Sequence, residues 1–135
     1  MAIVNTFPKC LQTPYLFVDT EAPHRVGGLL SLAGDRLDAA YNIQSTNQGD
    51  PADVVLLSYE AMFACLRALV YHKGYREAGL RCLLLACEEL YVRPGALDAS
   101  HLLAFERAQG LRAAPAETLA AAGSFVKRTL ELLKT

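Results

Sequence analysis

The chain has 135 residues, of which 53% are hydrophobic and 20% are charged. This length is typical of one domain with one core, and the apolar fraction is higher than that of an average soluble domain. With 13 basic and 14 acidic residues the net charge is −1. The overall charge therefore excludes a strong non-specific attraction to nucleic acid or to an anionic membrane, and such binding would need a local basic patch.

Residues 1–27 are predicted to form an irregular N-terminal arm, because Pro8, Pro14 and Pro23 interrupt every helical window. Residues 15–18, with the sequence YLFV, favour a short extended segment. We expect its aromatic side chains to cover an edge of the core or to contact a second subunit. The first residues have no basic start and no long apolar stretch, so no signal peptide is expected.

Two helices are predicted next, over residues 28–44 and from Asp50 onward. In the first, apolar residues recur every three or four positions, which is typical of a helix with one buried face. The second begins with Asp50 as N-cap and Pro51 at the first helical position. Residues 54–71 are apolar nearly all round, which predicts a central helix surrounded by the others.

Three further helices are predicted over residues 77–92, from about Asp98, and from Pro115 to near the end. No strand is predicted after Val18. The predicted fold is all-α, an antiparallel bundle of about five helices over residues 28–135. The uninterrupted apolar runs are much shorter than the ~20 residues of a membrane span, so no membrane-spanning segment and a cytoplasmic location are expected.

The four cysteines are Cys10, Cys65, Cys82 and Cys87. They form no Cys-x-x-Cys pair, and no nearby histidine completes a zinc-binding pattern. We therefore expect four reduced thiols that fill the core, with no metal site and no cofactor.

Residues 58–69, with the sequence SYEAMFACLRAL, and their continuation to Glu77 resemble the second helix and following turn of HEPN-domain proteins. They are most similar to small stand-alone prokaryotic members. The similarity covers roughly residues 29–133 in order. It implies a helical bundle that commonly dimerises. Many HEPN proteins are metal-independent ribonucleases, acting as toxins or in RNA processing, and many pair with a small nucleotidyltransferase-type protein.

The ribonuclease members carry an Arg, four to six residues, then a His, near the start of the final helical segment. This chain has Arg112 in that region, but no His follows it. Ala64 and Leu80 also stand where relatives often have His. General acid–base cleavage of RNA usually needs His. The resemblance therefore implies a binding or assembly module without catalysis, a homodimer, with a nucleotidyltransferase-type protein or RNA as partner.

Arg67 lies in the nearly apolar second helix, so it needs a partner. Glu60, Glu88 and Glu89 are the candidates, and the interpretation is either a packed ion pair or an anion contact. Basic residues around the following turn suggest an RNA or anion site, with Tyr71 and Tyr75 among them, although a solvated turn explains the same residues. This candidate set is Arg67, Lys73, Arg76 and Arg81.

The alternative function is a metal-independent ribonuclease, the toxin component of a toxin–antitoxin system, with a displaced catalytic set of Arg67, His72 and Arg112. A spacing of five places Arg67 and His72 on different faces of one helix, which disfavours this hypothesis. A third hypothesis is a small-ligand pocket between helices. His24 and His101 are predicted to be surface residues without a catalytic partner.

Overall fold

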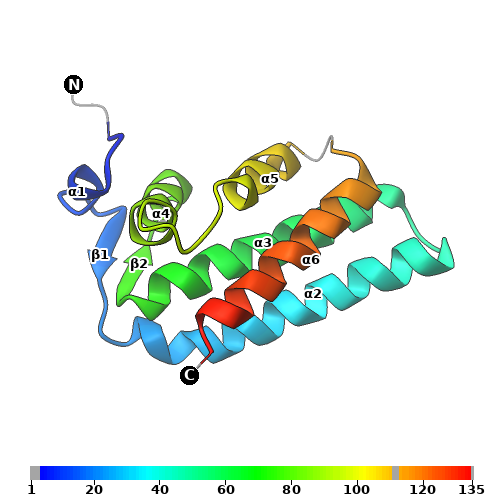
Figure 1. The fold of residues 1–135 in the computed structure, drawn as a ribbon, viewed down its shortest axis with the longest axis horizontal. Coiled ribbons are helices and arrows are strands. Elements are labelled where there is room, and N and C mark those ends of the chain that lie inside the picture. The colour runs from blue at the N-terminus through cyan, green and yellow to red at the C-terminus, as the bar shows by residue number, and fades with distance from the viewer. Residues whose placement is uncertain (1–3, 111–112, 135) are drawn as a thin grey trace.

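The computed structural model describes residues 4–110 and 113–134. These residues are mostly helical, which confirms the all-α class (Figure 1). The bundle consists of α2 (Val26–Thr46), α3 (Pro51–His72), α4 (Leu80–Cys87), α5 (Ser100–Gln109) and α6 (Pro115–Leu132). The long helices α2, α3 and α6 pack against one another, while α4 and α5 contact α3 on its other side (Figure 1).

Helix α3 is the central helix, as its composition predicts. Asp50 caps it by accepting a hydrogen bond from the Ala52 backbone N–H at 2.9 Å, and Pro51 starts the first turn. An 18-residue window of α3 has a mean hydropathy of 1.6, so it is long and apolar enough to cross a membrane, but 67% of that window is buried within the protein. Contact with α2, α4, α5 and α6 accounts for this composition without a bilayer.

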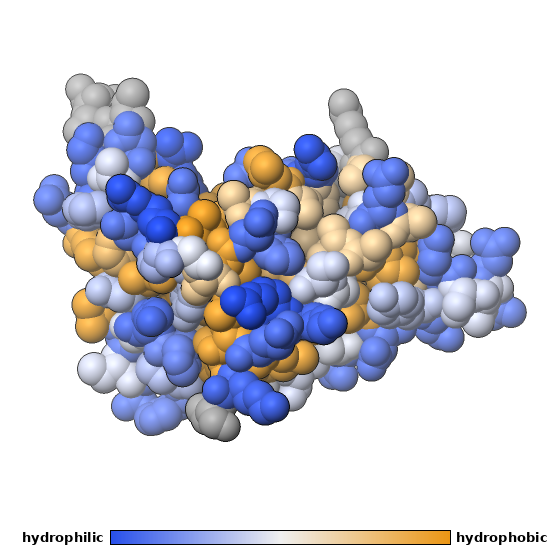
Figure 2. All heavy atoms as spheres, viewed as in Figure 1, coloured by the Kyte–Doolittle hydropathy of each residue, from blue (hydrophilic) through white to orange (hydrophobic). Residues whose placement is uncertain are grey.

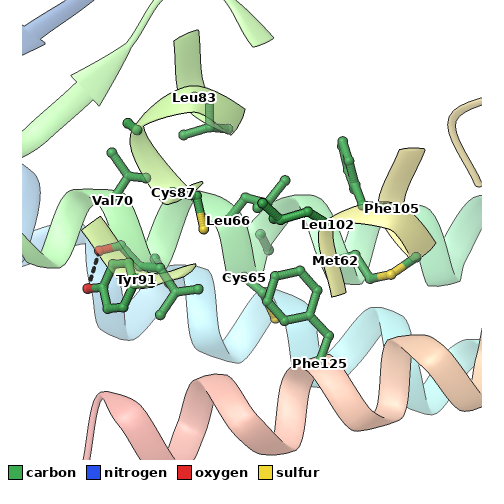
Figure 3. Close-up of a cluster of buried hydrophobic side chains, with 14 of the residues drawn as sticks. Met62, Cys65, Leu66, Val70, Leu83, Cys87, Tyr91, Leu102, Phe105 and Phe125 are labelled. Atoms are coloured by element: carbon green, nitrogen blue, oxygen red, sulfur yellow. Dashed lines mark hydrogen bonds between the residues drawn. The ribbon is translucent and has the colours of Figure 1, made fainter. Parts of the chain in front are cut away.

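The core is built around the inward faces of α3 (Figure 3). Met62, Leu66 and Leu69 are fully buried there, together with Phe105 from α5 and Phe125 from α6. Burial of each such side chain stabilises the fold by about 1.5–3 kcal/mol. The hydroxyl of Tyr91 donates a hydrogen bond of 2.6 Å to the Leu69 carbonyl, so this polar group is satisfied inside the core (Figure 3).

The N-terminal arm is more regular than predicted. It contains α1 (Phe7–Cys10), β1 (Leu16–Val18) and the 3₁₀ helix η1 (Ala22–Arg25), which leads directly into α2. Pro8 is tolerated because it lies in the first turn of α1. The predicted extended segment is confirmed, since β1 pairs antiparallel with β2 (Tyr75–Glu77).

Two sequence-based predictions are wrong around β2. The strand itself was not predicted, and the helix expected from residue 77 begins at Leu80. Gly74 has a φ of +87°, which stops α3 and turns the chain toward β1. After α4, the chain continues as a π-helical turn, η2 (Glu88–Val92). The three residues of β2 carry no strand pattern of their own. They form a strand by pairing with β1, which is distant in the sequence.

The prediction of four reduced thiols is wrong for two cysteines. Cys10 and Cys82 form a disulfide, because α1 folds back onto α4 and brings together residues separated by 72 positions. Cys65 and Cys87 are free and buried, as expected. Burial raises the pKa of each of these two thiols to about 12, so both remain protonated at neutral pH.

Candidate arginine-lined site

A groove of about 490 Å³ opens where η1 passes into α2 and faces the end of α3 and strand β2. We name it the arginine groove, because three of its lining side chains are arginines and only one is acidic. The residues that line it are His24, Arg25, Gly28, Leu29, Arg67, Tyr71, Arg76 and Glu77.

Local structure explains how these residues meet. Arg67 and Tyr71 are four residues apart on α3 and therefore share a face. Strand β2 supplies Arg76 and Glu77, and pairing with β1 holds that strand in place. Gly28 in the first turns of α2 has no side chain, and a Cβ added there would meet nothing within 4 Å, so the backbone forms an open wall.

Glu77 links strand β2 to helix α3 in the groove. Its side chain is only 7% exposed. One carboxylate oxygen lies 3.3 Å from Nη2 of Arg67, and the other accepts a 2.5 Å hydrogen bond from the Tyr71 hydroxyl. Burial, followed by the hydrogen bond and the charge of Glu77, raises the pKa of Tyr71 to about 12. Tyr71 is therefore a protonated hydrogen-bond donor at neutral pH.

Arg67 still has donors to offer a ligand. Its guanidinium stacks over the Phe63 ring, with 4.3 Å between the guanidinium carbon and the ring centroid. Its Nε is buried and has no hydrogen-bond partner among the described residues. A buried donor without a partner is costly for the fold. Because the Arg67 side chain is 40% exposed, a ligand would reach it through the exposed part of the guanidinium.

The sequence-based candidates for the partner of Arg67 were wrong. Glu60 instead accepts a 2.7 Å hydrogen bond from Arg36 of α2, and Glu89 pairs with Arg93 at 2.8 Å. The actual partner, Glu77, lies ten residues further along the chain and reaches Arg67 only because β2 turns back across the end of α3.

The predicted basic set divides between the groove and other contacts. Arg67 and Arg76 line the groove, and Nη1 of Arg76 lies 3.7 Å from a carboxylate oxygen of Asp19. Lys73 instead lies over the Tyr91 ring, 5.4 Å from its centroid. Arg81 donates from Nε to the Val4 carbonyl at 2.8 Å, which joins α4 to the arm.

The sequence did not predict that the arm supplies His24 and Arg25 to the same groove. No local pattern marks them, because they reach α3 only when η1 packs at the start of α2. His24 is highly exposed, and its Nδ1 lies 2.8 Å from a carboxylate oxygen of Glu21. His24 is thus an exposed residue, as predicted, but it borders the arginines of the groove and is not isolated.

The displaced catalytic set does not come together in the described residues. Arg67 lines the groove, whereas His72 is the exposed last residue of α3 and is not part of the lining. Arg112 lies outside the described residues. His101 is not a simple surface residue, since it is half-buried and stacks on the Phe125 ring at 5.1 Å between centroids. Burial lowers the pKa of His101.

The groove offers a ligand three guanidinium groups, of which Glu77 and Phe63 orient that of Arg67, together with the apolar Leu29 and a bare stretch of backbone. Guanidinium forks match the oxygens of phosphate and carboxylate groups. Within residues 4–110 and 113–134, no cluster of three or more His, Cys, Asp or Glu side chains has the arrangement needed to hold a metal ion. Comparisons with protein-family models, with curated proteins and with solved structures give no match to this chain.

Proposed function

We propose that this chain is a HEPN-like binding module without ribonuclease activity, which holds RNA through a phosphate group in the arginine groove. One observation carries the proposal: Arg25, Arg67 and Arg76 come from three separate elements and line a single groove with one carboxylate. Guanidinium groups pair with phosphate oxygens through charge-assisted hydrogen bonds, which are stronger than neutral ones. Glu77 and Asp19 balance part of this positive charge, so the three guanidinium groups leave a small local excess in a chain whose net charge is −1.

Two features of the groove support binding over cleavage. Tyr71 has a pKa raised to about 12, so its hydroxyl is a poor proton acceptor at neutral pH. Both carboxylate oxygens of Glu77 already accept hydrogen bonds, from Arg67 and Tyr71. Neither group is free to take a proton from an RNA hydroxyl.

Assembly as a homodimer is part of this proposal, as is a cytoplasmic nucleotidyltransferase-type partner. Large apolar side chains stay exposed on the arm around β1, where Figure 2 shows apolar atoms at the surface. These side chains are Leu11, Tyr15, Phe17 and Val18. Exposed apolar groups that gather on one surface favour contact with another protein. Sedimentation at micromolar concentration tests the dimer, and a single monomeric mass would contradict it.

Fluorescence anisotropy with a labelled single-stranded RNA tests the RNA proposal. We expect Arg67→Gln and Arg76→Gln each to weaken binding at least about tenfold, because each loses a phosphate contact. Arg93→Gln is the matched control: Arg93 also pairs with a glutamate but lies outside the groove, so binding should stay unchanged. Equal affinity of all three variants and the unmodified protein would refute the proposal.

The second candidate is ribonuclease activity, and the observation that favours it is His24 beside Arg25 in the groove. Incubation of purified protein with mixed RNA in the presence of a metal chelator distinguishes the two functions. The proposal expects intact RNA. Cleavage that His24→Ala abolishes would replace it with a ribonuclease centred on the groove, whereas cleavage that His72→Ala abolishes would restore the displaced set inferred from the sequence.

A further inference from the structure

Helices α2 and α6 lie side by side on one face of the bundle and run antiparallel (Figure 1). Leu30 is early in α2 and Leu133 is late in α6, yet both line one groove of about 570 Å³. Near the other end of α2, the Tyr41 hydroxyl lies 3.2 Å from the position that a Cβ on Gly123 of α6 would occupy. We name this groove the α2–α6 seam. The residues that line it are Leu30, Lys127, Leu130, Glu131, Leu133 and Lys134.

Part of this face is apolar and open to solvent. Leu130 and Tyr41 are each 48% exposed. Figure 2 shows apolar surface beside charged surface over the end of α6. Exposed apolar groups that gather next to charged ones are typical of a surface that another protein covers.

The two helices carry opposite charges along this face. Asp35 and Asp38 are exposed on α2, and Lys127 is exposed on α6. Among the residues that the structure describes, none of these three has an ion-pair partner within 4 Å. Asp38 precedes Tyr41 by three residues and Lys127 follows Gly123 by four, so each shares a helix face with its neighbour. Because the helices are antiparallel, both charges lie one turn along the bundle in the same direction from the Tyr41–Gly123 contact.

This pattern is complementary to itself under a two-fold rotation. An axis that runs along the face, parallel to the helices, places α2 of a second copy on α6 of the first at the same level, and α6 on α2. Asp38 of each copy then faces Lys127 of the other, so one charge pair forms twice. Leu130 of each copy meets Leu30 of the other in the same way. Stacking α2 on α2 would instead bring Asp38 against its own counterpart, which is repulsive.

The face is also large enough for a dimer. Helices α2 and α6 have 21 and 18 residues, so each is roughly 30 Å long at 1.5 Å per residue. Two such helices side by side are about 20 Å wide, which gives a flat area of roughly 600 Å² before the relief of the side chains is counted. A stable interface of standard size buries about 800 Å² on each partner. The available area is therefore comparable with the area that a stable dimer needs.

We infer that a second copy of this chain docks on the α2–α6 seam in a two-fold dimer, held by reciprocal Asp38–Lys127 pairs and by contact between Leu30 and Leu130. The inference rests on the homodimer in the proposed function and adds the surface that forms it. The arginine groove stays open in this dimer, because none of its lining residues lines the seam. The exposed apolar side chains of the arm then remain free for a partner of another kind.

A charge swap followed by sedimentation over a series of concentrations tests the inference. Lys127→Glu and Asp38→Lys each place like charges opposite one another at two symmetric positions. We expect each variant to raise the dissociation constant of the dimer at least about tenfold. An equimolar mixture of the two variants restores opposite charges at both positions, so it should form heterodimers with a dissociation constant within about threefold of that of the unmodified protein. Glu106→Lys is the matched control, because it reverses an exposed charge on α5, away from the seam, and should leave the dimer unchanged.

The outcomes separate this interface from the homodimer itself, with circular dichroism showing that each variant is folded. Equal dissociation constants for the two charge variants and the unmodified protein would overturn the seam as the interface while the dimer stood. Loss of the dimer in Val18→Asp would then assign the interface to the arm. Two weakened variants that do not recover when mixed would also overturn the reciprocal pairing. Unmodified protein that stays monomeric at micromolar concentration would overturn both the seam and the homodimer.

Discussion

At the scale of single residues, the hydroxyl of Tyr71 satisfies the nearly buried carboxylate of Glu77. It donates to Glu77, whose side chain is 7% exposed, so Tyr71→Phe would leave a nearly buried carboxylate with one donor fewer. We expect a loss of about 1–3 kcal/mol in the free energy of unfolding, measured by urea denaturation at pH 7. Tyr41→Phe is the control, since Tyr41 is 48% exposed and its loss of a hydroxyl should cost little. Equal stability of the two variants would contradict this role.

The same residue predicts a pH dependence. The pKa of Tyr71 is raised from 10.0 to about 12 in the folded state, so the fold favours the protonated phenol. Its contribution to stability is fully present below the pKa of the unfolded chain and is lost as the pH rises from 10 to 12. Tyr71→Phe has no proton to lose, so its unfolding free energy should fall less steeply across that window. Parallel curves for the variant and the unmodified protein would exclude this assignment.

At the scale of elements, α3 shows what the sequence could predict. Its cap, its first proline and its apolar surface are all local signals, and the helix begins and ends close to the predicted residues. Asp50→Ala should lower the free energy of unfolding by about 1 kcal/mol, because the cap bond to the Ala52 N–H is lost. Asp50→Asn keeps a side-chain acceptor, so its loss in unfolding free energy should be only a fraction of the loss in Asp50→Ala. Thermal unfolding of both variants measures the difference, and equal losses would mean that charge matters more than capping.

Strand β2 shows why the rest could not be predicted. Tyr75 and Arg76 lie in a predicted turn and Glu77 at the start of a predicted helix. The three residues become a strand only because β1, in the N-terminal arm, provides hydrogen-bonding partners. The partner of Arg67 was misassigned for the same reason. Half of the groove was therefore visible as basic residues near a turn, while the arm residues His24 and Arg25 required knowledge of the tertiary fold.

At the scale of the whole molecule, the disulfide between Cys10 and Cys82 attaches the N-terminal arm covalently to the helical bundle. The bond joins α1 in the N-terminal arm to α4 in the bundle. Disulfides persist in oxidising compartments and are rare in the cytoplasm. The cytoplasmic location expected from the sequence would therefore place the arm under reducing conditions, where β-pairing and the contacts of Leu16 and Cys10 with the core would have to hold it.

Reduction of this bond gives the last prediction. A cross-link between residues 72 positions apart should stabilise the fold by about 2–5 kcal/mol, because it restricts the unfolded chain. A reducing agent should therefore lower the urea midpoint of the unmodified protein and have no effect on a Cys10→Ser, Cys82→Ser double variant.

Cys65 and Cys87 are buried with pKa values near 12, so in the folded protein neither should react with a thiol reagent at pH 8. After reduction, we expect Cys10 and Cys82 to become reactive toward the thiol reagent. If RNA affinity then stayed unchanged, the contact of the arm with α4 would be independent of the arginine groove. A parallel loss of RNA affinity would instead tie the position of Arg25 to the covalent link.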